Sequence, residues 1–322
     1  LEAARANRIE IEWSGYAAPI PRQPGVTVFE AYPLRELAAL IDWTPFFHTW
    51  ELKGSYPKIL EDANKGEEAR KLFADAQVML ERIIAENWLQ ARAVIGLFPA
   101  NAVQDDVEIY ADESRSETLA RFHFLRQQRV RKGVPNYCLA DFVAPRESGI
   151  KDYLGFFAVT AGLGIATRLA EFEAEPGDYS AIMLKALAGR LAGALAEHLH
   201  WRVRREQWGY APDEALDNTA LIAEEYRGIR PAPGYPACPE HTEKRTLWSL
   251  LNVEANSGIR LTEHCAMYPA AAVSGVYFAH PEARYFAVGK IYRDQVADYA
   301  VRKGMSLAEA ERWLAPNLGY EP

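Results

Sequence analysis

Apolar residues at helical spacing predict two long amphipathic helices. The first runs roughly from Glu67 to Ala91, and the second begins near Ser180, with a leucine at every third or fourth position from 184 to 199, and ends near Trp208. The apolar positions of the first helix are Leu72, Phe73, Ala76, Met79, Leu80, Ile83 and Ile84. Shorter helices are predicted at 33–41, 219–227 and 242–251, and a Ser306–Glu309 capping box opens a last helix that Pro316 stops.

Strand-like runs lie between these helices. They cover residues 93–100, 107–112 and 117–128, and buried segments are predicted at 137–144 and 153–162. Residues 271–291 predict two strands around a turn at 280–282. Because the strands cluster instead of alternating regularly with helices, the order predicts an α+β fold and not a doubly wound sheet.

Composition narrows the class of protein. The chain has 322 residues and a formal net charge of −8, which argues against a general nucleic-acid binder, and its apolar runs are too short for a transmembrane helix. Three cysteines do not form a disulfide framework, and no secretory signal is visible, so we expect a cytoplasmic protein. The sequence starts at Leu1, and residues 1–13 are typical of a linker, so we expect a piece of a longer polypeptide.

Short sequence motifs give little support for a dinucleotide-binding site, a metal site or a catalytic nucleophile. Gly162 and Gly164 follow a strand, but Thr167 stands where a dinucleotide-binding loop needs its third glycine. Cys238 and His241 have acceptable zinc spacing, yet the adjacent pair 264–265 does not complete a usual ligand set, so no metal site is expected. The sequence has neither a nucleophile elbow nor a P-loop.

Two basic runs stand out on this acidic chain, Arg126–Lys132 and Trp201–Glu206. Solvated ends of a strand and a helix are the simpler interpretation. The alternative is a docking face for an acidic protein partner, whose binding would weaken as salt is added.

A proline-rich stretch, RGIRPAPGYPACPEHTEK at 227–244, predicts a stiff loop. Arg230 stands before a proline, so its backbone is biased toward extended geometry, and its planar fork suits a carboxylate. Gly234 permits a close backbone approach. A loop stiffened in this way binds a small ligand with a lower ordering cost, although a rigid surface connection is also consistent with it.

Several long motifs resemble one family. RPAPGYPACPEHTEK, DWTPFFHTWELKG, GFFAVTAG, NYCLADFVAP, RDQVADYAVRKGMS and WLAPNLGY are similar to the C-terminal activation domain of cobalamin-dependent methionine synthase, over nearly the whole chain. The resemblance implies a single C-shaped α+β domain with a central antiparallel sheet at 29–322, after a linker and leading segment at 1–28. It also implies S-adenosylmethionine binding, and supply of its methyl group to reactivate cob(II)alamin held by a neighbouring domain.

The resemblance also implies site residues and partners. Arg230 would hold the ligand carboxylate and Asp42 its ammonium group, while Tyr285 and Phe286 supply aromatic contacts on the second strand of the hairpin; Phe286 lacks the hydroxyl found in many relatives. Tyr235, Ala232 and Gly234 would line the same groove, and Glu224 would support the loop electrostatically. No catalytic side chain of the domain's own is implied. Partners would be the cobalamin-binding domain of the same polypeptide and a flavodoxin-type reductase, with the domain itself a monomer.

Two other functions are consistent with the sequence. The chain could be a free-standing methyltransferase with another acceptor. It could also be a non-catalytic module that caps the cobalamin domain and docks the reductase. Methylation of an acceptor without the cobalamin domain would favour the former, and a chain indifferent to S-adenosylmethionine would favour the latter.

Overall fold

A six-stranded antiparallel sheet forms the centre of the molecule in the computed structural model, which describes residues 1–174 and 176–322. Its path is β4-β3-β2-β5-β8, and β1 pairs with the first half of β2. The strands are β1 (Gly25–Tyr32), β2 (Gln90–Val103), β3 (Asp106–Tyr110), β4 (Thr118–His123), β5 (Asp152–Leu163) and β8 (Ala272–Tyr277), and a separate pair is β6 (Arg260–Leu261) with β7 (Met267–Tyr268).

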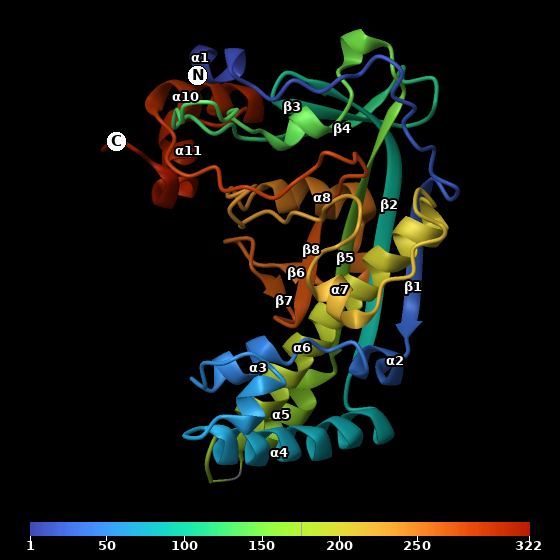
Figure 1. Ribbon diagram of the computed structural model, residues 1–322, viewed down its shortest axis with the longest axis vertical. Helices are drawn as coiled ribbons and strands as arrows, with labels where there is room; N and C mark the ends of the chain where they lie inside the picture. Colours follow the sequence, from blue (N-terminus) through green and yellow to red (C-terminus); the bar gives the residue numbers. More distant parts are fainter. Residues whose placement is uncertain (175) are drawn as a thin grey trace.

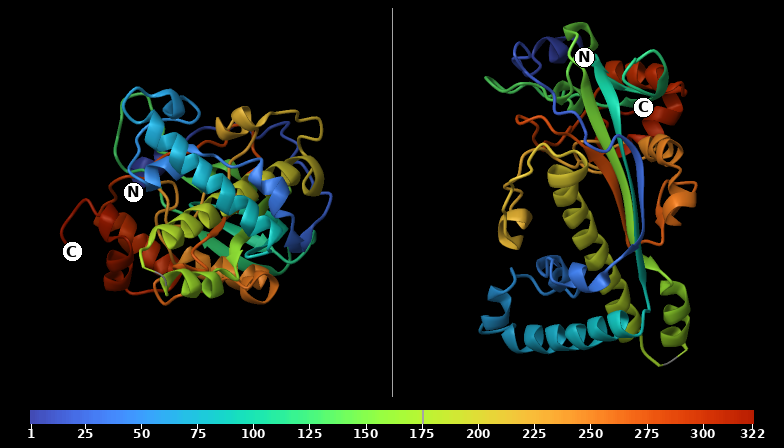
Figure 2. Two further views of the ribbon diagram at one scale, coloured as in Figure 1. Left: turned by 90° about the horizontal axis from the view of Figure 1, so that it is seen from below. Right: turned by 90° about the vertical axis from the view of Figure 1, so that its right-hand side faces the viewer.

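Side chains point alternately to the two faces of the sheet, and helices cover both faces. On β2, Ile95 and Leu97 pack in the core that includes α6 (Tyr179–Arg202). Val94 and Phe98 lie in the core of the other face, with α8 (Glu243–Leu251) and α9 (Val253–Ser257). Figure 2 shows the long strands edge-on, with helices on both sides.

The remaining helices lie mainly toward the two ends of the sheet, and the outline is that of a C (Figure 1). One end carries α2, α3, α4 and α5, and the other carries α1, α10 and α11. Their bounds are α1 (Glu2–Ala6), α2 (Leu34–Ala38), α3 (Thr44–Thr49), α4 (Gly66–Ala85), α5 (Ile165–Glu173), α7 (Asn218–Ile222), α10 (Arg293–Lys303) and α11 (Leu307–Trp313). Within the described residues, no helix has the length and apolarity needed to cross a membrane.

The α+β class with its central antiparallel sheet is therefore confirmed, while several element boundaries differ from the sequence predictions. The helix expected over 67–91 ends at Ala85, because Asn87 takes a positive φ of 53° and the chain then enters β2. The helix expected over 219–227 ends at Ile222, two residues before Glu224 takes a φ of 57°. The predicted Ser306 cap is present, since its side chain accepts the Glu309 N–H.

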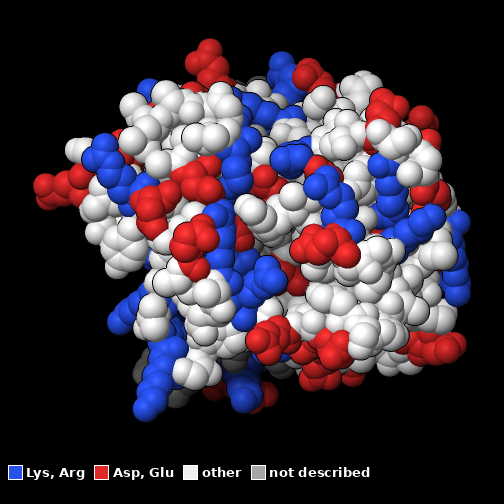
Figure 3. Space-filling view, turned by 90° about the horizontal axis from the view of Figure 1, so that it is seen from above, with Lys and Arg blue, Asp and Glu red and all other residues white. Residues whose placement is uncertain are grey.

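Two arginines of the basic runs lie inside the fold and not on its surface, which corrects the interpretation of those positions. Arg126 is 2% exposed and pairs with Asp105 and Asp141, while Arg204 is fully buried and pairs with Glu214. Buried guanidinium groups need such partners to offset desolvation. Acidic and basic side chains are interspersed over the end of the molecule shown in Figure 3, which has no uniformly basic face.

Candidate functional site

The proline-rich loop lies along the open edge of the sheet. Ile229 and Phe278 exchange backbone hydrogen bonds at 3.1 and 3.0 Å, and the Val276 N–H donates to the Pro231 carbonyl at 2.9 Å. Gly275 permits this approach, because a Cβ there would lie 2.7 Å from the Pro231 oxygen. The sheet therefore holds the backbone on both sides of Arg230 at the edge of β8.

The same pairing explains why the predicted second hairpin strand is absent. Tyr285 and Phe286 were expected on a strand next to β8, but they lie in an extended segment outside the sheet. The β8 edge is already occupied by the loop, so this segment bonds to the loop instead: Val288 N–H donates to the Pro236 carbonyl at 2.8 Å. The Tyr285 hydroxyl accepts the Arg230 N–H at 2.9 Å.

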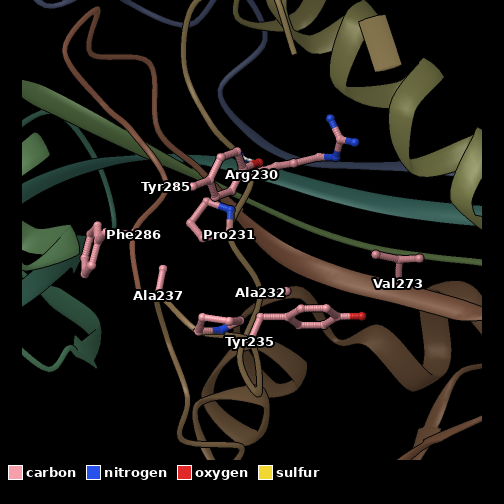
Figure 4. Close-up of a pocket in the computed structure, with 9 residues that line it drawn as sticks. Arg230, Pro231, Ala232, Tyr235, Ala237, Val273, Tyr285 and Phe286 are labelled. Carbon is pink, nitrogen blue, oxygen red and sulfur yellow. Dashed lines mark hydrogen bonds between the residues drawn. The ribbon is translucent and has the colours of Figure 1, made fainter. Parts of the chain in front are cut away.

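An apolar cavity of about 530 Å³ opens between the loop and this segment. Figure 4 shows its lining side chains, with the Tyr235 ring below and Tyr285 and Phe286 at the other side. The lining residues are Arg230, Pro231, Ala232, Tyr235, Pro236, Ala237, Val273, Tyr285 and Phe286. Tyr235 is 66% exposed, so one of its ring faces is free to stack against a flat ligand.

The Arg230 side chain leaves this cavity and reaches helix α6 (Figure 4). Its Nη2 and Nη1 donate to the two carboxylate oxygens of Glu197 at 2.6 and 3.2 Å. Nη1 also donates to the Tyr226 hydroxyl at 2.5 Å and lies 3.3 Å from His200 Nδ1. The guanidinium is thus held in a bidentate ion pair within the protein.

Burial governs the electrostatics around Arg230. Burial alone would lower the pKa of Arg230, but Glu197 and Tyr226 outweigh it and raise that pKa. Burial, with Arg204 and Arg230 nearby, lowers the pKa of His200 well below its usual range, so its ring is neutral and its Nδ1 can accept a hydrogen bond. Burial also raises the pKa of Tyr285, which stays protonated.

A second, charged chamber of about 250 Å³ adjoins the apolar cavity at Arg230. Its charged lining residues are Asp42, Arg190, Glu197, Glu224 and Arg230, and Leu40, Gly193, Ala194 and Ile222 complete it. Asp42 lies between α2 and α3, and its Oδ1 accepts the Thr44 N–H at 3.1 Å. Burial raises the pKa of Glu224, while Arg230 opposes that effect.

The structure brings together most of the residues singled out in the sequence, but in two groups that meet at Arg230. Ala232, Tyr235, Tyr285 and Phe286 line the apolar cavity, and Asp42 and Glu224 line the charged chamber. Gly234 lines neither; its φ of 94° shapes the loop, where a Cβ would meet the His241 ring at 2.4 Å.

Two residues on α6 were missed by sequence reasoning. Arg190 and Glu197 are seven positions apart, a spacing that places both on one face of a helix. Two charged residues on one face of a largely apolar helix were the available signal.

The described part of the chain contains no cluster of three or more His, Cys, Asp or Glu side chains arranged to hold a metal ion. Cys138, Cys238 and Cys265 are buried free thiols. Burial raises the pKa of Cys238 and Cys138, so neither is a ready thiolate nucleophile.

An apolar cavity and a chamber lined by both signs of charge, with Arg230 in the wall of each, are typical of an α+β domain that binds a small amphiphilic molecule. The chain belongs to the family of vitamin B12-dependent methionine synthase activation domains, whose pattern it matches over residues 33–304. It is similar to the solved structure of the MetH reactivation domain bound to AdoHcy, with 57% sequence identity and a TM-score of 0.97 over 100% of this chain and 98% of that one. The resemblance drawn from the sequence motifs is thereby confirmed.

Proposed function

We propose that this chain binds S-adenosylmethionine and supplies its methyl group for reductive methylation of cob(II)alamin carried by a neighbouring domain of the same polypeptide. The observation that supports it best is the pairing of the two cavities at Arg230. A similar reactivation domain was solved with AdoHcy, the product that remains when such a methyl group has been transferred.

The two cavities suit the two halves of this ligand. The adenosine half is flat and mostly apolar, which fits the cavity lined by Tyr235, Tyr285 and Phe286. The amino-acid half is a zwitterion, which fits a chamber that offers carboxylates and guanidinium groups together. Asp42 is proposed to meet its ammonium group and Arg230 its carboxylate. The backbone around Ala232 and Gly234 would shape the same groove, and Glu224 would support the loop electrostatically as a weaker candidate.

The domain's contribution to the reaction is placement. The sulfonium of S-adenosylmethionine supplies an electrophilic methyl group, and reduced cobalamin on the other domain would receive it. The chain then only has to orient the ligand against that partner, so no nucleophile of its own is required. We infer that the isolated domain, without the cobalamin domain, is inactive.

We further propose residues 1–28 as the linker and leading segment, residues 29–322 as the activation domain, and a flavodoxin-type reductase as electron donor. The exposed run 129–132 is the candidate docking face that remains once Arg126 is assigned to the interior, with Val130 75% exposed within it. Reductase binding should weaken as salt is added, and a salt-independent affinity would remove this part of the proposal.

Titration calorimetry of the purified domain with S-adenosylmethionine tests the proposed function. Wild type should bind one equivalent, and Tyr235→Ala should bind about tenfold more weakly because a stacking face is lost. Tyr268→Ala is the matched control, since Tyr268 is a 47% exposed tyrosine that lines neither cavity. Absence of heat from wild type, or equal losses in both variants, would overturn the proposal.

A further inference from the structure

The edge strand β4 borders a groove that is separate from the cavities described above. β4 ends the sheet on one side, and α8 packs against it, with Phe122 and Leu247 in a common core. The groove between them has a volume of about 710 Å³, and none of the described residues that line it lines the apolar cavity or the charged chamber. A ligand in this groove would therefore not compete with one at Arg230.

The outer edge of β4 has backbone groups available for pairing. The Phe124 N–H donates to the Asp105 carbonyl at 3.1 Å, so the alternation of an antiparallel ladder turns the backbone groups of Arg121 and His123 away from β3. The His123 N–H accordingly donates to the Glu243 carboxylate at 3.3 Å. Among the described residues, no hydrogen bond joins the backbone of Arg121 to a segment other than β3, so a further strand could pair there.

The groove is basic although the chain is acidic. Arg121, His123 and Arg245 line it, and none of the described residues in its lining is acidic. Arg121 and Arg146 share one carboxylate, that of Glu108, so positive charge remains in excess on their side. Arg245 is exposed, and within the described part of the chain no carboxylate oxygen lies within 4.0 Å of its nitrogens. The charge of the groove therefore suits an acidic ligand.

The two arginines lie on opposite sides of the position that an added strand would take. Phe122 faces the core beneath α8, so its neighbour Arg121 points to the other face of the sheet, where it pairs with Glu108. Arg245 stands on α8, on the side of Phe122. Successive residues of an added strand also point to opposite faces, so two adjacent acidic residues would each meet one arginine.

We propose that β4 and α8 form a docking groove for an extended acidic segment of a partner protein, which adds a strand to the edge of the sheet. Backbone hydrogen bonds to Arg121 would supply affinity, and the two arginines would select carboxylates. A second copy of this chain does not suit the groove, because its own β4 edge would bring like charge against Arg121. This inference does not rest on the proposed function, since it concerns a different face of the molecule.

Fluorescence anisotropy with a labelled peptide, Thr-Val-Glu-Glu-Val-Thr, tests the docking groove. Wild type should bind it saturably, and Arg245→Glu should bind it about tenfold more weakly, because the cation facing one carboxylate is reversed. The same peptide with glutamine in place of glutamate should also bind wild type about tenfold more weakly. Absence of saturable binding to wild type, or equal binding of the glutamine peptide, would overturn the proposal.

A third peptide distinguishes strand addition from simple attraction of an anion. It has the glutamate sequence with every backbone amide N-methylated, so it keeps the charge but cannot donate the hydrogen bonds of a strand. It should not bind, because the backbone pairing with Arg121 is lost. Equal binding of the methylated peptide would mean that the groove is an anion site without strand addition, and would overturn the proposal.

Control variants separate docking from net charge and from folding. Arg260→Glu reverses an exposed arginine outside the groove and should leave peptide binding unchanged; a loss equal to that of Arg245→Glu would overturn the proposal. Ser249→Trp fills the groove without changing its charge and should weaken binding about tenfold, and an unchanged affinity would count equally against it. Arg245 and Ser249 are both exposed, so circular dichroism should show an intact fold in either variant. Affinity for S-adenosylmethionine should be the same in Arg245→Glu as in wild type, so failure of the peptide test leaves the proposed function standing.

Discussion

The Arg230 guanidinium is held by three groups from two parts of the chain: Glu197 and His200 on α6, and Tyr226 before the loop. With its backbone N–H donated to the Tyr285 hydroxyl, both ends of the residue are fixed. A bidentate pair that is mostly removed from water is costly to break, so this arginine is fixed in position before ligand arrives. Asp42 lines the same chamber, and the proposed function assigns it to the ligand's ammonium group.

Asp42→Asn should weaken ligand binding more than it weakens the fold. Asparagine keeps an oxygen that can accept the Thr44 N–H, while the negative charge facing the ligand's ammonium group is lost. We expect about a tenfold loss in affinity by calorimetry, with the free energy of unfolding changed by less than about 0.5 kcal/mol. Asp62→Asn is the control, since Asp62 makes a similar turn with Asn64 and Lys65 on the surface. Equal losses of affinity and stability would indicate a structural role for Asp42.

Among the residues of the site, those that lie in recognisable sequence motifs could be predicted. Arg230, Asp42 and Tyr285 lie in such segments, and the structure places each at a cavity wall. Arg190 and Glu197 lie in a helix whose periodicity is typical of a core element. Helical spacing tells which residues share a face but not which loop will cover that face, so their neighbours could not be predicted.

The loop at 229–236 and strand β8 act as one element. The loop extends the antiparallel pairing of the sheet by one partial strand, and Gly275 is where the two backbones come closest. The loop is therefore stiffened both by its prolines and by its hydrogen bonds to the central sheet. A ligand-binding loop attached in this way needs little ordering when ligand binds.

Gly275→Ala should damage both the fold and the site. Its Cβ would lie 2.7 Å from the Pro231 oxygen and 2.8 Å from the Phe157 ring, so the loop must move away from β8. We expect about 1–3 kcal/mol of destabilisation in chemical denaturation, and weaker binding of S-adenosylmethionine. Gly189→Ala is the contrasting control, because a Cβ at Gly189 on α6 has nothing within 4 Å and alanine favours helix. An undamaged Gly275→Ala protein would show that the loop is not fixed at this point.

Elements defined by local pattern were predicted well, and those defined by distant pairing were not. Five of the six strands of the sheet follow from alternation and apolar runs, whereas β1, which pairs with β2, was not predicted. The segment around Tyr285 has the same alternation, yet it is not a strand, because the edge that it would need is taken by residues about fifty positions earlier. Which segment pairs with a given edge of the sheet depends on the tertiary structure, and a short stretch of sequence does not determine it.

The leading segment packs against elements that support the site. Trp13 and Tyr16 pack against His280, with ring centroids 5.0 and 4.7 Å away, and Trp208 donates its indole N–H to the Pro19 carbonyl. His280 follows closely after Phe278, which pairs with the loop. The leading segment therefore packs close to the edge of the sheet that holds Arg230.

The titration of His280 should make the stability of the fold depend on pH. Burial, with Arg227 nearby, lowers the pKa of His280 to about 4, below the value of about 6.5 expected in the unfolded chain. The unfolded state then binds more protons between these values, so this contribution to stability is complete above about pH 6.5 and is lost as pH falls toward 4. The expected loss is about 2 kcal/mol in the free energy of unfolding.

Denaturant unfolding of wild type and His280→Asn at about pH 7.5 and about pH 4.5 measures this loss. Asparagine keeps an acceptor for the Glu282 N–H but does not titrate, so wild type should lose about 2 kcal/mol more than the variant across the interval. Other groups, among them Asp152, whose pKa burial raises to about 6, titrate equally in both proteins and cancel in the difference. An identical pH dependence in both proteins would mean that His280 is neutral for stability, and the leading segment would then be held by its remaining contacts, such as that of Trp208 with Pro19.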